Sequence, residues 1–243
     1  MTSRRPIQWR DLQFETDDDD VYAPKPASLL LAEEAIKVIP KGAIALDACT
    51  GSGVVGIAIA KYVPGTSVTV SDVNEAALAS ARRNARRNTV DVAVVSASLY
   101  SGFPQESLDV ITVHPPAVPY PEGDDWGLSA GMRVATNGGD DGSTLVLRSI
   151  AEAKPHLRRD GRLLLLLPHW SNVPAARETL AKHYPKVREL ARKQVEFFPA
   201  KEGRSTHHLL SHVKGLAARG IIEMTFEGDV PLSTVSVIEA CRD

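Results

Sequence analysis

The sequence contains little cysteine, no long hydrophobic run and no excess of charge of either sign. Its only cysteines, Cys49 and Cys241, provide no disulfide framework and no zinc-ligand spacing. The most apolar short run, Leu163 to Leu167, is far too short to span a bilayer, and residues 1–10 lack the apolar core of a signal peptide. A formal net charge of −2 gives no general attraction to nucleic acid or anionic membranes. These absences predict a soluble cytoplasmic protein with no membrane partner and no metal site, for which nucleic acid is a disfavoured partner.

The composition is typical of one globular domain preceded by a polar arm. Hydrophobic residues make up 43% of the chain and charged residues 24%, which are ordinary values for a folded domain. A length of 243 residues is enough for a single α/β domain with a full core. Residues 1–20 are predicted to form a flexible arm, because the four aspartates from Asp17 to Asp20 repel one another and stay solvated. Residues 21–243 are predicted to form one domain.

Strand and helix signals alternate along this domain. Apolar runs predict strands near residues 43–47, 67–71, 91–96, 108–113, 162–167, 187–197, 221–226 and 233–240. Helical signals predict one helix capped by Ser28 and others over 54–62, 75–88 (capped by Asn74), 144–157 and 205–218. This alternation predicts an α/β fold with a doubly wound, mostly parallel, seven-stranded Rossmann-like sheet. The last two apolar runs are close enough in sequence to form an antiparallel pair at its edge.

The most informative segment joins the first predicted strand to the next helix through a glycine-bearing turn. The strand ends at Asp47, and the turn carries Cys49, Gly51 and Gly53. Glycines let the backbone approach a ligand closely, and amides at a helix N-terminus favour polar or anionic groups. The second strand ends at Asp72, about 20 residues on, where nucleotide-binding α/β folds place a carboxylate on ribose hydroxyls. This spacing predicts an adenosine-containing cofactor.

Two departures from the dinucleotide-binding fingerprint favour a cationic cofactor. Cys49 stands where the first glycine would be, and Asp47 places a negative charge that would repel a pyrophosphate. The same carboxylate suits a ligand with an amino group and a sulfonium cation. S-adenosylmethionine is therefore the predicted cofactor. Asp47 is expected near its methionine amino group, Gly51 and Gly53 close to it, and Asp72 on its ribose.

The end of the fourth predicted strand supplies a second group of candidates, because ligands of such sheets bind outside the carboxyl ends of the strands. The strand is followed by His114-Pro115-Pro116-Ala117. Two consecutive prolines remove two backbone donors and fix the direction of the chain. This segment is predicted to form a wall of the reaction centre.

These motifs resemble those of the HemK-type class I methyltransferases, which methylate protein glutamine amides and belong to a wider group with an Asn/Asp-Pro-Pro-Tyr motif. The resemblance runs from about Val21 to Pro168. The matching pieces are the entry at 21–24, the turn at 47–53, Asp72 with the helix after it, Pro115-Pro116, and 138–142, which is similar to a Gly-Gly-Pro-Asp-Gly stretch. The resemblance implies a class I methyltransferase fold and methyl transfer to a nitrogen of a planar amide or amine, with a protein side chain as acceptor.

Three positions depart from the pattern of that family. His114 stands where the family's Asn or Asp holds a planar NH2 group, Ala117 where an aromatic ring stacks on that group, and Ser98 where an acid caps the adenine amino group. Two alternatives therefore stay open. One is a small-molecule N- or O-methyltransferase with His114 at the acceptor, where the imidazole would serve as a base. The other is a non-catalytic, cofactor-binding partner subunit.

The predicted site residues fall into three sets. Those predicted to bind the cofactor are Tyr22, Asp47, Cys49, Gly51, Gly53, Asp72, Ser98, Leu99 and His114. His114 and Pro115 are the predicted catalytic residues. Those predicted to contact the substrate are Pro116, Tyr120, Trp126 and His169. Residues 117–143 are long for a connection without secondary structure, which predicts a functional loop over the site.

Overall fold

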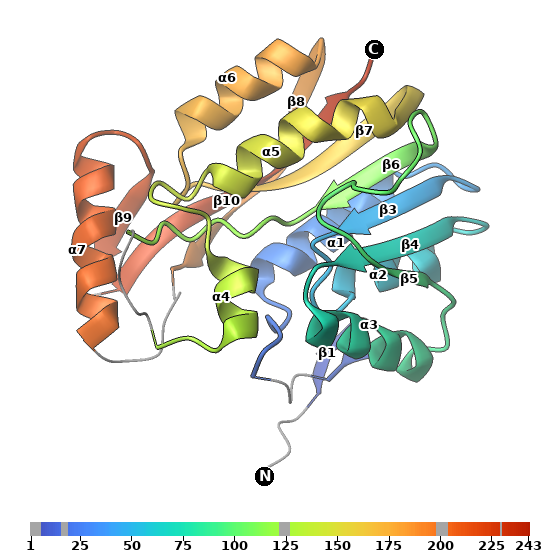
Figure 1. Cartoon of the computed structure of the whole chain (residues 1–243), viewed down its shortest axis with the longest axis horizontal. Helices are drawn as coiled ribbons and strands as arrows, with labels where there is room; N and C mark the ends of the chain where they lie inside the picture. Colours follow the sequence, from blue (N-terminus) through green and yellow to red (C-terminus); the bar gives the residue numbers. More distant parts are fainter. Residues whose placement is uncertain (1–5, 16–18, 122–126, 198–203, 229) are drawn as a thin grey trace.

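The computed structural model describes residues 6–15, 19–121, 127–197, 204–228 and 230–243, which form a central mixed sheet with helices on both sides (Figure 1). The strands of this sheet are β3 (Ile44–Ala48), β4 (Ser67–Asp72), β5 (Ala93–Ser96), β6 (Leu108–Val113), β7 (Leu157–Pro168), β8 (Lys186–Glu196), β9 (Met224–Glu227) and β10 (Val230–Cys241). Seven of them follow the order β5-β4-β3-β6-β7-β10-β8, and β9 pairs with the beginning of β10. The five strands from β5 to β7 in this order are parallel, and β10 is antiparallel to both neighbours. The predicted doubly wound sheet is confirmed. The last two strands pair antiparallel as predicted, but β10 lies between β7 and β8 rather than at the edge of the sheet.

Helices cover both faces of this sheet (Figure 1). On one face lie α1 (Pro26–Val38), α2 (Val54–Tyr62) and α3 (Glu75–Arg87), and on the other α5 (Thr144–Ala153) and α6 (Val173–His183). The leucine run of β7 serves both sides: Leu164 and Leu166 pack on the α1 face, and Leu163, Leu165 and Leu167 on the α5 face. A strand buried on both faces needs a continuous apolar run, which is what the sequence supplies. Among the described helices, none has the length and apolarity required to cross a membrane.

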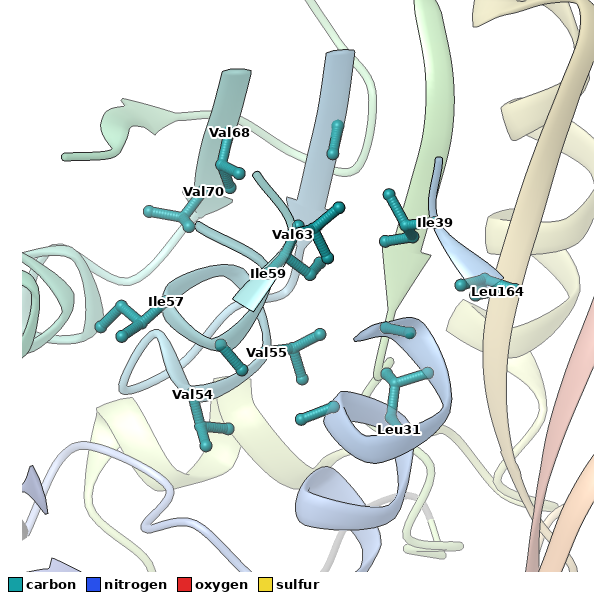
Figure 2. Close-up of a cluster of buried hydrophobic side chains, with 14 of the residues drawn as sticks. Leu31, Ile39, Val54, Val55, Ile57, Ile59, Val63, Val68, Val70 and Leu164 are labelled. Atoms are coloured by element: carbon teal, nitrogen blue, oxygen red, sulfur yellow. The ribbon is translucent and has the colours of Figure 1, made fainter. Parts of the chain in front are cut away.

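Each face of the sheet has a hydrophobic core, and the larger one, on the α1 face, contains α2, the helix that follows the glycine turn. Figure 2 shows Val55 and Ile59 of α2 between Leu31 of α1 and Val70 of β4. All four side chains are at most 3% exposed. Burial of an aliphatic side chain of this size contributes about 1.5–3 kcal/mol, so α2 is held firmly against the strands that carry the site.

The predicted flexible arm over residues 1–20 is wrong for residues 7–14. These residues form a β-hairpin of β1 (Ile7–Trp9) and β2 (Leu12–Phe14). Leu12 and Phe14 lie on the same side of their strand and are fully buried against the α1 face of the sheet. The alternation of apolar and polar residues in this short strand is the signal that the prediction missed.

Asn84 of α3 and Asn88, the C-cap of this helix, bind the hairpin to the rest of the fold. Asn88 Oδ1 accepts the backbone N–H of Gln13 at 2.8 Å, and Asn84 Oδ1 accepts that of Glu15 at 2.8 Å. The Asn84 amide also donates to the carbonyl oxygen of Ser52 at 2.9 Å. Asn84 therefore ties the N-terminal hairpin directly to the glycine turn.

Two predicted helix boundaries are wrong. The first helix begins at Pro26 rather than after Ser28, because proline is pre-organised for the first helical position. Ser28 instead lies in the first turn, where its hydroxyl accepts the Lys25 N–H at 3.0 Å. The helix predicted over 144–157 ends at Ala153 and is followed by a 3-10 turn over Lys154–His156. In contrast, the predicted cap of α3 is confirmed, since Asn74 Oδ1 accepts the Ala76 N–H at 3.0 Å.

The expectation that residues 117–143 lack secondary structure is also wrong. They contain the short helix α4 (Ala130–Thr136), whose N-cap Ser129 accepts the Met132 N–H at 3.2 Å. The end of α4 pairs with the start of the same segment, because Val118 donates its N–H to the Thr136 carbonyl oxygen at 2.8 Å. Beside Val118, the helix α7 (Arg204–Ala218) completes a third hydrophobic cluster.

We expect Asn84→Ala to lower the free energy of unfolding by about 2–4 kcal/mol, because the Glu15 N–H and the Ser52 carbonyl both lose their partner. Chemical denaturation at fixed pH measures this change. Arg86→Ala, on the exposed side of the same helix, is the control and should change the free energy by about 0.5 kcal/mol or less. Equal effects of the two substitutions would contradict a structural role for the asparagine.

Candidate active site

A cavity lies at the carboxyl ends of the parallel strands, where the ligand of such a sheet is expected to bind. Its lining includes ten residues predicted from the sequence: Tyr22, Asp47, Cys49, Gly51, Asp72, Ser98, Leu99, His114, Pro115 and Pro116. Residues outside the predicted set complete it, among them Ala117, Val118, Val134, Ala135, Thr136, Leu145, Pro168 and Trp170. The strand-end rule thus located the cavity, and most of the unpredicted lining is apolar.

Asp47 lies at the base of the cavity and is only 2% exposed. Its Oδ2 accepts the Thr50 hydroxyl at 2.5 Å and the Gly56 N–H at 3.0 Å, and its Oδ1 accepts the Thr112 hydroxyl at 2.8 Å. Burial raises the pKa of this carboxyl to about 6, because the loss of solvent outweighs these three hydrogen bonds. Asp47 therefore connects β3, β6, the turn and α2 around one buried carboxylate.

The turn after Asp47 is held in a conformation that L residues rarely adopt. Cys49, Gly51 and Gly53 have φ values of 54°, 54° and 87°. Cys49 lacks the freedom of glycine, so its left-handed backbone costs about 1–2 kcal/mol. Gly53 is the N-cap of α2, and a Cβ there would lie 3.1 Å from that of Ala81. Gly53 therefore lets the turn pack closely against Ala81 of α3, and it does not itself line the cavity.

Asp72 ends β4, which lies on the other side of β3 from β6 and the segment at 114–117, and it contacts the same turn. Its Oδ2 accepts the Gly51 N–H at 2.9 Å and its Oδ1 the Asn74 N–H at 3.0 Å. Burial raises the pKa of Asp72 in spite of these bonds. Each carboxylate oxygen keeps a further lone pair, so Asp72 has the capacity to accept two more hydroxyl groups. Ser98 and Leu99 follow β5 and line the cavity near it.

His114 and Tyr22 form the opposite wall. Their rings meet edge to face, with centroids 6.2 Å apart and planes at 88°. Burial lowers the pKa of His114 to about 4, so the imidazole is neutral at physiological pH. A neutral imidazole presents one nitrogen that donates and one that accepts. Pro115 and Pro116 continue this wall without contributing a backbone donor.

The predicted substrate contact of His169 is wrong. His169 is 1% exposed, its Nδ1 lies 2.6 Å from Glu223 Oε2, and its Nε2 lies 2.9 Å from the Ser236 hydroxyl. His169 and Trp170 form a turn after β7, in which the His169 side chain contacts Ser236 of β10 while Trp170 lines the cavity. The Ser-His-Glu series resembles a hydrolase triad, but Ser236 is fully buried and therefore inaccessible to a substrate.

Two other predicted substrate contacts have different outcomes. Tyr120 is 3% exposed and packs in the cluster beside α7 rather than in the cavity lining. Trp126 lies outside the described residues. In their place the structure brings Val134, Ala135 and Thr136 of α4 to the cavity. The serine cap at the start of α4 was the available signal for this helix.

Solved structures place this architecture in a known fold class. The YcgJ protein from Bacillus subtilis superposes with a TM-score of 0.62 at 14% identity, over 89% of this chain and 97% of that one. A methyltransferase from Pyrococcus furiosus superposes with a TM-score of 0.51 at 19% identity, over 94% and 89% of the two chains. Together with the sheet order and the glycine turn, these likenesses define the class I methyltransferase fold.

The comparison of sequences gives the family. Residues 24–125 match the model of the methyltransferase small domain. A candidate protein N5-glutamine methyltransferase of Methanocaldococcus jannaschii is 31% identical over 73% of this chain and 87% of its own length. The chain therefore belongs to the HemK-like family of S-adenosylmethionine-dependent methyltransferases.

Bacterial relatives of the same family are longer than this chain. The release factor glutamine methyltransferase of Gloeobacter violaceus is 33% identical over 65% of this chain and 57% of its own length. The ribosomal protein uL3 glutamine methyltransferase of Xanthomonas campestris is 37% identical over 49% of this chain and 40% of its own. The chain thus spans about half the length of these relatives.

We expect Asp47→Asn to stabilise the ligand-free chain at pH 8 by roughly 2–4 kcal/mol. A carboxyl whose folded pKa is raised to about 6 destabilises the fold when ionised. This penalty is present above about pH 7 and is relieved as the pH falls through 6 toward 4. The asparagine can keep all three contacts, because the Thr112 hydroxyl also lies 3.5 Å from the Leu46 carbonyl oxygen and can donate there instead.

Urea denaturation at pH 8 and pH 4.5 measures the difference between the two chains. Glu75→Gln, an exposed change at the start of α3, serves as the control and should show no such pH dependence. An Asp47→Asn chain that is less stable at both pH values would contradict the assignment of a desolvated carboxylate that destabilises the fold when ionised.

Proposed function

We propose that this chain binds S-adenosylmethionine in the strand-end cavity and transfers its methyl group to a nitrogen of a planar amide or amine. The observation that carries the proposal is the pair of carboxylates, Asp47 and Asp72, on either side of the glycine turn. Neither forms an ion pair with any residue that the structure describes, although burial raises the pKa of both. A ligand with a cationic centre supplies the missing positive charge.

The residues present fit the cofactor at each of its parts. Asp72 keeps the lone pairs that two ribose hydroxyls need, and Leu99 gives an apolar surface beside it for the adenine. Asp47 places negative charge toward the methionine end. Tyr22 closes the cavity from the N-terminal segment. Ser98 is a shorter hydrogen-bonding group than the acid at this position in the resembling family, and we assign it to the adenine edge.

Catalysis by this chain rests on positioning. When bound, the cofactor supplies a methyl group that its sulfonium has already activated. The chain then has to hold the acceptor atom in line with that methyl group and keep water away, which can supply most of the acceleration. His114 and Pro115 line the side of the cavity that would face the acceptor. The neutral imidazole of His114 can accept a hydrogen bond from an N–H or O–H of the acceptor.

The family supports a protein side-chain amide as the acceptor. The relatives from Gloeobacter and Xanthomonas are glutamine methyltransferases by name. The entry segment at Tyr22, the turn and Pro115-Pro116 support the same chemistry in this chain. A protein acceptor must then reach His114 from outside the cavity.

A second candidate is a small molecule methylated on nitrogen or oxygen. His114 and Ala117 replace the side chains that hold and stack a planar amide in the resembling family. The wall beside them is apolar, with Val118, Leu145 and Trp170, and it suits an acceptor with an apolar body. Size separation of a cell extract after transfer from labelled cofactor distinguishes the two acceptors: label on macromolecules supports the amide, and label on small molecules supports the alternative.

We expect Asp72→Ala to weaken binding of S-adenosylmethionine and S-adenosylhomocysteine at least about tenfold, because the ribose loses charge-assisted hydrogen bonds worth about 1.5–3 kcal/mol. Titration calorimetry measures both ligands. Asp72→Asn preserves the shape and tests the charge, and Glu75→Ala removes a nearby exposed charge as the control. No binding of either ligand to the natural chain would refute the proposal, whereas binding without transfer to any extract would favour a non-catalytic subunit.

We expect His114→Ala to slow methyl transfer about 100-fold, with the affinity for S-adenosylhomocysteine changed about threefold or less. His183→Ala is the control, because His183 is the last residue of α6 and does not line the cavity. Because the pKa of His114 is lowered to about 4, the rate of the natural chain should not fall through protonation of this residue above about pH 5. A His114→Ala chain with the natural rate would remove His114 from the reaction centre.

A further inference from the structure

Helix α4 lines the cavity with its C-terminal half and is bound to other segments at both of its ends. Its last turn is bound to the segment after β6, where the Val118 N–H donates to the Thr136 carbonyl oxygen at 2.8 Å. Its first turn is bound to Asp20, whose Oδ1 accepts the Gly131 N–H at 3.2 Å. Between these two anchors, Val134 and Ala135 line the cavity. The position of α4 therefore determines the shape of the acceptor side.

The contact between Asp20 and Gly131 is close enough to require glycine. A Cβ at Gly131 would lie 2.4 Å from the Asp20 carbonyl oxygen and 2.6 Å from the Asp20 Cβ. Such distances do not occur between real atoms, so any side chain at this position would push α4 away. The aspartate tract is expected from its charge to stay solvated, but Asp20, its last residue, packs against α4.

On its other side, Asp20 is connected to the cofactor end. Its carbonyl oxygen accepts the Asn74 side-chain amide at 2.8 Å. The backbone N–H of Asn74 donates to Asp72 Oδ1 at 3.0 Å, and Asp72 Oδ2 accepts the Gly51 N–H at 2.9 Å. A continuous series of hydrogen bonds thus runs from the glycine turn, through Asp72 and Asn74, to Asp20 and α4.

We propose that Asp20 is a positioning residue that couples occupancy of the cofactor end of the cavity to the placement of α4 over the acceptor end. The proposal rests on the function proposed above, because it requires the ribose to bind at Asp72. A ligand on Asp72 fixes the carboxylate to which Asn74 is bound. The same ligand packs against Tyr22, two residues after Asp20, so the segment is restrained from both directions.

The coupling has a consequence for the order of binding. The wall made by Val134, Ala135 and Thr136 reaches its final position when the cofactor end is filled, so the acceptor binds best to the cofactor-loaded chain. Coupling of binding free energies is reciprocal, so an acceptor that packs against α4 must tighten cofactor binding by the same factor. Asp20 would affect the acceptor without touching it.

Hydrogen exchange of the full chain, with and without saturating S-adenosylhomocysteine, tests the coupling. The reporters are the helical amides of α4, among them Arg133, which donates to the Ser129 carbonyl at 2.9 Å, and Asn137, which donates to that of Arg133 at 3.0 Å. In the natural chain we expect the ligand to slow their exchange about tenfold. In Asp20→Ala the ligand still binds, and we expect the slowing to fall to about twofold or less.

Three matched variants separate coupling from simple loss of stability. Asp20→Asn keeps an oxygen that accepts the Gly131 N–H, and it should restore the ligand-dependent slowing. Gly131→Ala leaves Asp20 intact but displaces α4, and it should abolish the slowing. Glu75→Ala removes one exposed charge at the same end of α3 and should behave as the natural chain does.

Two results would overturn the coupling: ligand binding that leaves α4 unprotected in the natural chain, or equal protection in the natural chain and in Asp20→Ala. Calorimetric titration of the same samples tells these results apart from a failure of the proposed function. If S-adenosylhomocysteine does not bind the natural chain at all, the proposed function fails, and the coupling fails with it.

Discussion

The buried carboxylate of Asp47 is part of the candidate site and also holds several segments of the fold together. It takes hydrogen bonds from Thr50 in the turn, Thr112 on β6 and the Gly56 N–H in α2, so four segments converge on one buried group. Its raised pKa means that the ionised carboxylate destabilises the folded chain. Stability alone would favour a neutral side chain here. A costly buried charge beside a glycine turn is what a site for a cationic ligand requires.

The rest of the cavity depends on segments that are remote in sequence. The N-terminal hairpin does not touch the cavity, yet it is bound through Asn84 to Ser52 in the glycine turn. The segment after it supplies Tyr22 to the wall and Asp20 to α4. Ligands of doubly wound sheets bind outside the carboxyl ends of the strands. In this chain the N-terminal segment and α4 both line the cavity at that place.

Much of the fold and ten of the residues that line the cavity could be predicted because their signals are local. Alternating apolar runs and caps such as Asn74 specified the sheet and its helices, and the strand-end rule selected Asp47, Asp72 and His114. The remainder depends on three-dimensional contacts. Which of His169 and Trp170 faces the cavity is decided by the turn after β7, where His169 is bound to Glu223 and Ser236. Burial of Leu12 and Phe14 depends on the helices that cover them. The packing of Asp20 against α4 depends on the space left by Gly131, which is remote in sequence.

No local sequence signal identifies the acceptor, because His114 and Ala117 replace the side chains that hold and stack a planar amide in HemK-type enzymes. The cofactor is the central claim, and a crystal structure of the full chain with S-adenosylhomocysteine tests it most directly. The account predicts the ribose hydroxyls within hydrogen-bond distance of the Asp72 carboxylate and the sulfur on the side of His114 and Pro115. A ligand with its ribose away from Asp72, or one bound in the groove between α6 and β8, would contradict the account.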